Sequence, residues 1–167
     1  MAEKQSLFTA DSSTGKELFR WWEDLRDDRA SRAVLKRCST PLEVVMTASY
    51  QRLYQRLVLV GLQRVNPDRD TDHLPAAIGL LAHVRTNTTT SLPTLFSNSD
   101  PLPLHPLRFR SLLESSDVAD LYTGLRRALP LIDHVAPVLD LAHDVYYWGD
   151  GVKRRWVYDY HWPSKAA

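Results

Sequence analysis

The amino-acid sequence predicts an all-α protein made of two small helical bundles joined by a Pro/Ser/Thr-rich linker. Apolar residues recur at the helical spacing of about 3.6 residues in almost every periodic stretch. No Asn-Gly or Asp-Gly turn joins two strand-like stretches, and signals for helix starts recur along the chain. The 167 residues are 44% hydrophobic and 25% charged, values typical of a globular chain and not of a disordered one.

The N-terminal part begins with two predicted helices, over residues 15–27 and 29–37. Thr14 and Glu17 have the spacing of a capping box, in which each side chain satisfies a backbone amide at the helix start. One face of the first helix is apolar and is expected in the core; it carries Leu18, Trp22 and Leu25.

A third helix is predicted over residues 42–60. Thr40 is its expected cap, Pro41 occupies the first helical position, and Glu43 closes a second capping box. The helix is expected to end near Gly61. Its predicted buried stripe consists of Leu42, Met46, Ser49, Leu53, Leu57 and Val60.

Residues 66–72 read as a polar loop, and residues 74–81 as a fourth helix with Pro75 in its first turn. The composition then changes, because residues 86–106 hold four prolines among Thr, Ser and Asn. This composition predicts a linker with one helical turn near residues 92–96.

The linker divides the chain into a predicted N-terminal bundle, residues 1–88, a linker, residues 89–106, and a C-terminal bundle, residues 107–167. Because a core this small is marginal alone, we expect the halves to pack on each other or on a partner. The predicted helices of the second half cover residues 107–114, 117–131, 137–148 and 152–161.

Composition excludes several classes of protein. Cys38 is the sole cysteine, so no intrachain disulfide is possible. The longest apolar run, residues 57–62, is far shorter than the roughly 20 residues of a membrane span, and the first residues lack the apolar segment of a secretory signal. We therefore expect a cytoplasmic protein that does not associate with membranes.

Asp140, His143 and Asp144 have the spacing of half a di-metal site on one helix. Their face lies opposite the apolar stripe of the same helix, so a solvated polar face is the favoured interpretation. No catalytic residue, metal site or cofactor is predicted, and a metal-dependent hydrolase is the least favoured class.

The cations carry the functional hypothesis. Arginine outnumbers lysine 16 to 5, and residues 29–64 contain seven cations but one acid, Glu43. Arg29, Arg32 and Lys36 lie along one face of the predicted helix over residues 29–37. Like charges arranged in this way repel one another, so the arrangement is easier to explain if an anion binds in front of it. The candidate nucleic-acid-binding residues are Arg29, Arg32, Lys36, Arg37, Arg52, Arg56, Arg69, Arg108, Arg110, Arg126 and Arg127.

Two alternatives that involve no nucleic acid remain for these residues. The cations are either surface charge, paired with nearby acids, or the basic patches of a helical adaptor that meets acidic protein surfaces. The acids that could pair with them are Asp27, Asp28, Asp117 and Asp120.

Seven collinear segments resemble the CasB family, the small subunit of the type I-E CRISPR surveillance complex Cascade. Together they extend over about residues 17–162. In chain order they are FRWWEDL, RAVLKRCSTPLEV, YQRLYQRL, LRFRSLLES, DLYTGLRRALPLI, LDLAHDVYYWGD and RRWVYDYHW. Each is a short piece of amphipathic helix, so their shared order carries the signal.

The resemblance implies an all-α, non-enzymatic subunit that self-associates beside the backbone and large subunits of Cascade. It implies contact with crRNA, target DNA and the displaced strand, and so a role in stabilising the R-loop during antiviral defence. The family's basic positions match Lys36 with Arg37, Arg108, and Arg126 with Arg127, while Arg69 matches in a loop that aligns poorly.

Overall fold

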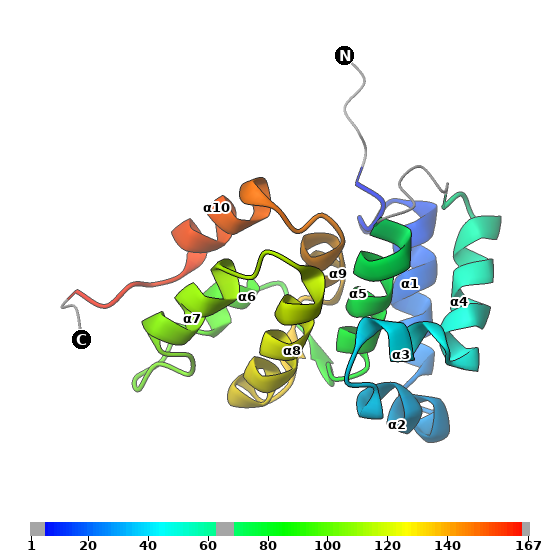
Figure 1. Cartoon of the computed structure of the whole chain (residues 1–167), viewed down its shortest axis with the longest axis horizontal. Helices are drawn as coiled ribbons and strands as arrows, with labels where there is room; N and C mark the ends of the chain where they lie inside the picture. The colour runs from blue at the N-terminus through cyan, green and yellow to red at the C-terminus, as the bar shows by residue number, and fades with distance from the viewer. Residues whose placement is uncertain (1–5, 63–68, 165–167) are drawn as a thin grey trace, which may run out of the picture.

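The computed structural model describes residues 6–62 and 69–164 and confirms the all-α prediction. In Figure 1 the N-terminal helices lie on one side, the C-terminal helices on the other, and α5 and α9 between them. The α-helices are α1 (Ser13–Asp24), α2 (Arg29–Arg37), α3 (Pro41–Val45), α4 (Ala48–Leu59), α5 (Leu74–Leu81), α6 (Leu92–Leu95), α7 (Pro106–Leu113), α8 (Val118–Ala128), α9 (Val138–Tyr146) and α10 (Asp150–Asp159).

The first helix begins at Ser13, two positions before the predicted start at residue 15. Ser12, not Thr14, is the N-cap: its hydroxyl accepts the Gly15 amide at 2.9 Å. The Thr14 hydroxyl donates instead to the carbonyl of Leu7. The Thr14 capping box is therefore wrong, because residues 7–12 fold into a turn that brings another hydroxyl to the helix start.

The predicted helix over residues 42–60 is broken into α3 and α4. The Thr47 hydroxyl donates to the Val44 carbonyl at 2.7 Å and accepts the Tyr50 amide at 3.2 Å, so Thr47 ends one helix and caps the next. Such local bonds compete with the helical ladder. The break turns Leu42 and Met46 outward, with exposed fractions of 67% and 71%, which corrects the predicted buried stripe.

The cap at Thr40 is confirmed, since its hydroxyl accepts the Glu43 amide at 3.2 Å. The helix ends at Leu59, near Gly61 as expected, and the φ of 115° at Gly61 suits glycine. Of the predicted loop over residues 66–72, residues 66–68 lie outside the described part. Arg69–His73 form a short π-helix, η1, directly before α5.

α5 confirms the helix predicted over residues 74–81, and it is buried on every side. It packs on α9, α8, α3 and α2, so elements of both halves enclose it. A Cβ on Gly79 would lie 2.8 Å from both the Tyr122 hydroxyl and Val44 Cγ2, so glycine permits this close approach. One continuous hydrophobic cluster extends through both halves, as the expected packing of the halves on each other requires.

The described residues also contain one strand pair that periodicity does not reveal. β1 (Thr86–Asn87) pairs in parallel with β2 (Val135–Ala136). The Asn87 side chain then accepts the Val138 amide at 3.0 Å and so caps α9. Two-residue strands are too short to leave an alternating pattern in the sequence.

The predicted linker contains the expected helical turn, α6, and packs against α10. Leu92, Phe96 and Leu104 are buried, and the Tyr160 hydroxyl donates to the Leu104 carbonyl at 2.6 Å. The division into domains at residues 88 and 107 stays a prediction.

The second half follows the predicted order of helices with one change. The helix expected over residues 117–131 ends as α8, and Leu129–Ile132 continue as a 3-10 turn, η2, that contains Pro130. Asp117 caps α8 by accepting the Asp120 amide at 3.0 Å.

The prediction that Asp140, His143 and Asp144 face solvent is wrong for Asp144, which is 7% exposed. α10 packs against this carboxylate, which accepts Trp156 Nε1 at 2.8 Å and pairs with Arg155. The fold thus uses Asp144 to bind α9 to α10. No helix in residues 6–62 and 69–164 is long and apolar enough to span a membrane.

Tyr122 connects the two halves through one buried hydrogen bond. Its hydroxyl donates to the Cys38 carbonyl, just beyond α2, at 2.7 Å. Tyr122→Phe should lower the free energy of unfolding in urea by about 1–3 kcal/mol, because it leaves a buried carbonyl unpaired. Tyr158→Phe is the control, since Tyr158 is 84% exposed. Equal effects of the two substitutions would contradict this role.

Limited proteolysis tests the domain division. We expect the first cleavage between residues 86 and 106, at the exposed residues 98–101, because exposed polar loop tips are preferred sites of nicking. Fragments that end within α4 and appear earlier would argue against the two-bundle division.

Candidate nucleic-acid interface

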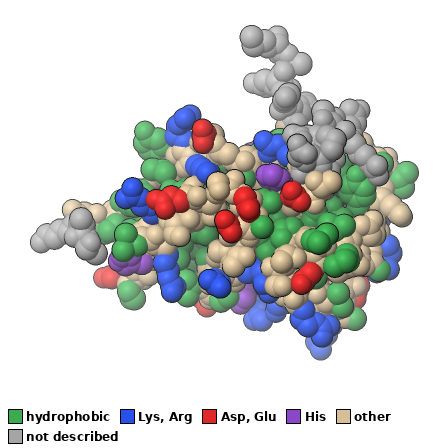
Figure 2. Space-filling model, in the orientation of Figure 1, with side chains coloured by type: hydrophobic (Ala, Val, Ile, Leu, Met, Phe, Trp, Pro, Cys, Tyr) green, Lys and Arg blue, Asp and Glu red, His purple; other side chains and the backbone are tan. Residues whose placement is uncertain are grey.

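Four cations and two histidines from both halves converge where α2, the end of α5, the end of α8 and the loop before β2 meet. In Figure 2, Lys and Arg side chains gather along the edge of the molecule that runs from α2 to α8. We call this set the junction cluster; it consists of Arg32, Lys36, His83, Arg85, Arg126 and His134.

Backbone carbonyls hold the cluster together. Arg32 Nε donates to the Ala82 carbonyl at 3.2 Å, and Arg126 Nη2 donates to the Lys36 carbonyl at 3.1 Å. His134 Nδ1 lies 2.9 Å from the His83 carbonyl. Helix ends leave carbonyls without partners, so Arg126 also satisfies the C-terminus of α2.

The loop that carries His134 has an unusual backbone. Asp133 and His134 have φ values of 57° and 59°, the left-handed region that non-glycine residues rarely adopt. The Arg85 amide donates to the His134 carbonyl at 2.8 Å, which helps to hold this conformation. This strained backbone conformation, which costs free energy, places His134 beside His83.

Positive charge in the cluster lacks a counter-charge. Among the ion pairs of residues 6–62 and 69–164, none includes a cluster member. Burial lowers the pKa of Lys36, and the charges of Arg32 and Arg85 lower it further. Burial is also the main cause that lowers the pKa of His83 to about 4, with Arg126 and Lys36 adding to it.

Hydrogen-bonding capacity in the cluster is unused. Arg32 Nη2, Arg126 Nε and His83 Nε2 are buried and have no partner in the structure. An unpaired buried polar atom costs free energy. A bound anion would offset the crowded positive charge of the cluster.

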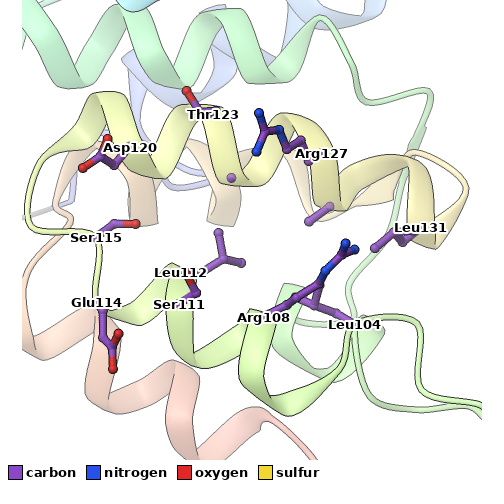
Figure 3. Close-up of a pocket in the computed structure, with 12 residues that line it drawn as sticks. Leu104, Arg108, Ser111, Leu112, Glu114, Ser115, Asp120, Thr123, Arg127 and Leu131 are labelled. Carbon is purple, nitrogen blue, oxygen red and sulfur yellow. The ribbon is translucent and has the colours of Figure 1, made fainter.

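A second site is a groove between α7 and α8 with a volume of about 730 Å³. In Figure 3, Arg108 from α7 points into the groove near Leu104 and Leu131, and Arg127 lies along α8 with its guanidinium toward Thr123; both residues line the groove. Both arginines are exposed, and no ion pair in the described residues includes either of them. The structure therefore brings together two of the predicted cations.

Other predicted cations have local partners. Arg56 Nε lies 3.6 Å from Glu17, and Arg110 Nε lies 3.3 Å from Glu114. Arg52 lines a small cavity of about 180 Å³ with Asp24 and Asp28. The surface-charge alternative thus fits this set, although Glu17 and Glu114 were not among the acids it names.

Arg69 connects η1 to α9. Its Nη1 donates to the Tyr146 carbonyl at 2.6 Å, and its guanidinium lies 5.5 Å from the centre of the Tyr147 ring. Arg29 and Arg37 are exposed at the two ends of α2.

Sequence reasoning misses half of the junction cluster. His83, Arg85 and His134 are isolated in the sequence and share no helix face with another cation. A signal that could have found them is the end of the apolar segment 74–82, where a buried helix returns to the surface. Within the described residues, no group of His, Cys, Asp and Glu could hold a metal ion.

The fold and these sites define a class: a small all-α protein that gathers unpaired cations from both halves on one surface. The family described as CRISPR-associated protein Cse2 matches residues 31–161. The chain belongs to this family, which confirms the resemblance to the CasB family.

One solved structure shares the fold with a TM-score of 0.68. It is a chain in the crystal structure of E. coli Cascade bound to a PAM-containing dsDNA target. The two chains are 22% identical, and the match covers 87% of this chain and 92% of that one. No curated protein gives a significant sequence match.

The low pKa of His83 predicts acid sensitivity. An unfolded histidine has a pKa of about 6.5, so the unfolded chain binds more protons than the folded chain between pH 6.5 and about 4. The stability contribution is complete above pH 6.5 and is lost as the pH falls toward 4. Chemical unfolding across this range should show a smaller loss for His83→Gln than for wild type.

His161→Gln is the control for this pH series, because His161 is exposed. It should follow the wild-type curve. If His83→Gln also follows that curve, the conclusion that His83 is buried and uncharged in the folded protein is wrong.

Proposed function

We propose that this chain is the small subunit of a type I-E Cascade and acts as a non-catalytic, cytoplasmic component of CRISPR defence. In this role it contacts the backbone and large subunits and a second copy of itself. It holds the backbone of crRNA and target DNA and the displaced strand, and so stabilises the R-loop. Family membership and the shared fold of a Cascade chain support the assembly.

The observation that carries the nucleic-acid part is the junction cluster, whose cations have no carboxylate partner among the described ion pairs. Phosphate groups suit such a cluster, because they bring negative charge and accept hydrogen bonds from its accessible cations. The cluster joins both halves, so its cations have a fixed spacing.

This arrangement suits binding that does not depend on sequence. Guide pairing supplies specificity in RNA-guided systems, while protein side chains hold the backbone. Phosphate contacts carry no base information. A few cations on a rigid helical surface are sufficient for such a task.

Exposed apolar side chains support assembly with protein partners. Leu42 on α3, Met46 directly after it and Leu59 at the end of α4 are 67%, 71% and 84% exposed. Large exposed apolar side chains of this kind support contact with a protein partner.

The test uses complexes reconstituted with the double variant Lys36→Ala/Arg85→Ala. Arg32 and Arg126 are left intact, because they bond backbone carbonyls and their loss would disturb the fold. Target DNA affinity is measured at several salt concentrations. Each lost phosphate contact should flatten the log–log salt dependence by roughly 0.7–0.9 units, equally for different target sequences. Affinity should fall by roughly thirtyfold or less, since each of the two charges contributes about 1 kcal/mol at most.

The control is Lys16→Ala/Arg154→Ala, which removes the same charge from exposed positions outside the cluster. It should leave the salt slope unchanged. An unchanged slope and affinity for the cluster variant, together with normal complex assembly, would reject the nucleic-acid role. Loss of assembly for that variant would favour the adaptor alternative.

A further inference from the structure

The charged and apolar side chains of the groove between α7 and α8 are arranged so that they complement a nucleotide. Its cations are Arg108 on the α7 wall, which points into the groove, and Arg127 on the α8 wall (Figure 3). Its floor includes the buried Leu112, and Leu131 lies near Arg108. Ser111 lies on the α7 wall and the Asp120 carboxylate lies toward the opposite end.

We propose that this groove accepts one unpaired nucleotide of a single strand, with its phosphate between the two arginines and its base on the apolar floor. The proposal rests on the proposed function and specifies what the groove binds. Two guanidiniums from opposite walls can each donate to one phosphate. The base edge can then bond to hydroxyl and carboxylate oxygens at the far end.

The size and charge of the groove suit an unpaired nucleotide. About 730 Å³ lies within the range of small-ligand sites. A base that is stacked and paired in a duplex must be unpaired and unstacked before it can enter such a groove, which costs free energy, so unpaired strands are favoured. An acidic peptide would bring negative charge beside Asp120, whereas a nucleotide is negative at its phosphate and carries amino donors on its base.

The groove depends on the close approach of the two helices. A Cβ on Gly124 in α8 would lie 2.5 Å from Leu112 Cδ2 in α7, so glycine lets the walls meet at the floor. The neighbouring Ser111 is exposed, and no side-chain hydrogen bond of the described residues uses its hydroxyl. A larger side chain at this position would fill the groove without changing its charge.

The experiment measures the affinity of the full chain, at low salt, for a labelled single strand of about ten nucleotides, a length within known single-strand site sizes. The same strand with abasic sugars and the same sequence as a duplex are the comparisons. We expect wild type to prefer the unmodified strand over the abasic strand by about fivefold or more, because apolar burial of the base and its hydrogen bonds, worth about 1 kcal/mol or more together, are lost without the base. The duplex should bind no better than the abasic strand.

Ser111→Phe should reduce this preference to about twofold or less, while Ser13→Phe, at an exposed position outside the groove, should preserve it. Arg108→Ala/Arg127→Ala should weaken binding of both strands. Equal affinity for unmodified and abasic strands, no effect of Ser111→Phe, no measurable binding of any strand, or displacement of the strand by an equimolar acidic peptide would each overturn the proposal.

The experiments distinguish failure of the groove proposal from failure of the proposed function. If wild type shows no preference for bases while Lys36→Ala/Arg85→Ala still flattens the salt dependence in the complex, the groove proposal is wrong and the backbone-holding role stands. If the preference for bases is present and the cluster variant has no effect in the complex, the reverse holds.

Discussion

Complete burial of α5 is the constraint on which the rest of the structure depends. A helix with apolar residues on all faces must be enclosed, and neither half of this chain has enough helices to enclose it alone. α3 and α2 cover one side, and α8 and α9 cover the other. The hydrophobic effect therefore joins the two halves into one continuous core, which offsets the marginal stability of each small bundle.

The same packing explains why cations meet at one place. The chain leaves the buried helix at Ala82, whose carbonyl accepts a bond from Arg32 on α2. Tyr122 and Arg126 on α8 donate to carbonyls at the end of α2. Each of these bonds satisfies a helix end that would otherwise be unpaired, and the bonds of Arg32 and Arg126 also draw a positive group toward the junction. The free energy gained from these hydrogen bonds to carbonyls at the helix ends thus offsets the repulsion among the cations.

Cations in this protein consequently have different physical roles. Arg32 and Arg126 hold the two halves in register through backbone carbonyls, and Arg69 holds η1 to α9 in the same way. Arg56 and Arg110 form exposed ion pairs of the kind that contribute little to stability. Lys36 and Arg85 at the junction, and Arg108 and Arg127 in the groove, have no carboxylate partner among the described ion pairs. A polyanion can use these four positions.

Local signals in the sequence determined the helices, their order and several caps. Thr40 and Asp117 cap helices as their spacing predicts, because an N-cap needs only a hydroxyl or carboxylate within a few residues. The family resemblance and the cationic character of α2 and α8 were also visible in the sequence. Tertiary structure decided the rest. Asp144 became buried because α10 covers it, and His83, Arg85 and His134 joined the cluster because packing of α5 brings together segments about 50 residues apart. Contacts between such distant segments leave no periodic pattern, since they depend on which helix faces meet and not on neighbours along the chain.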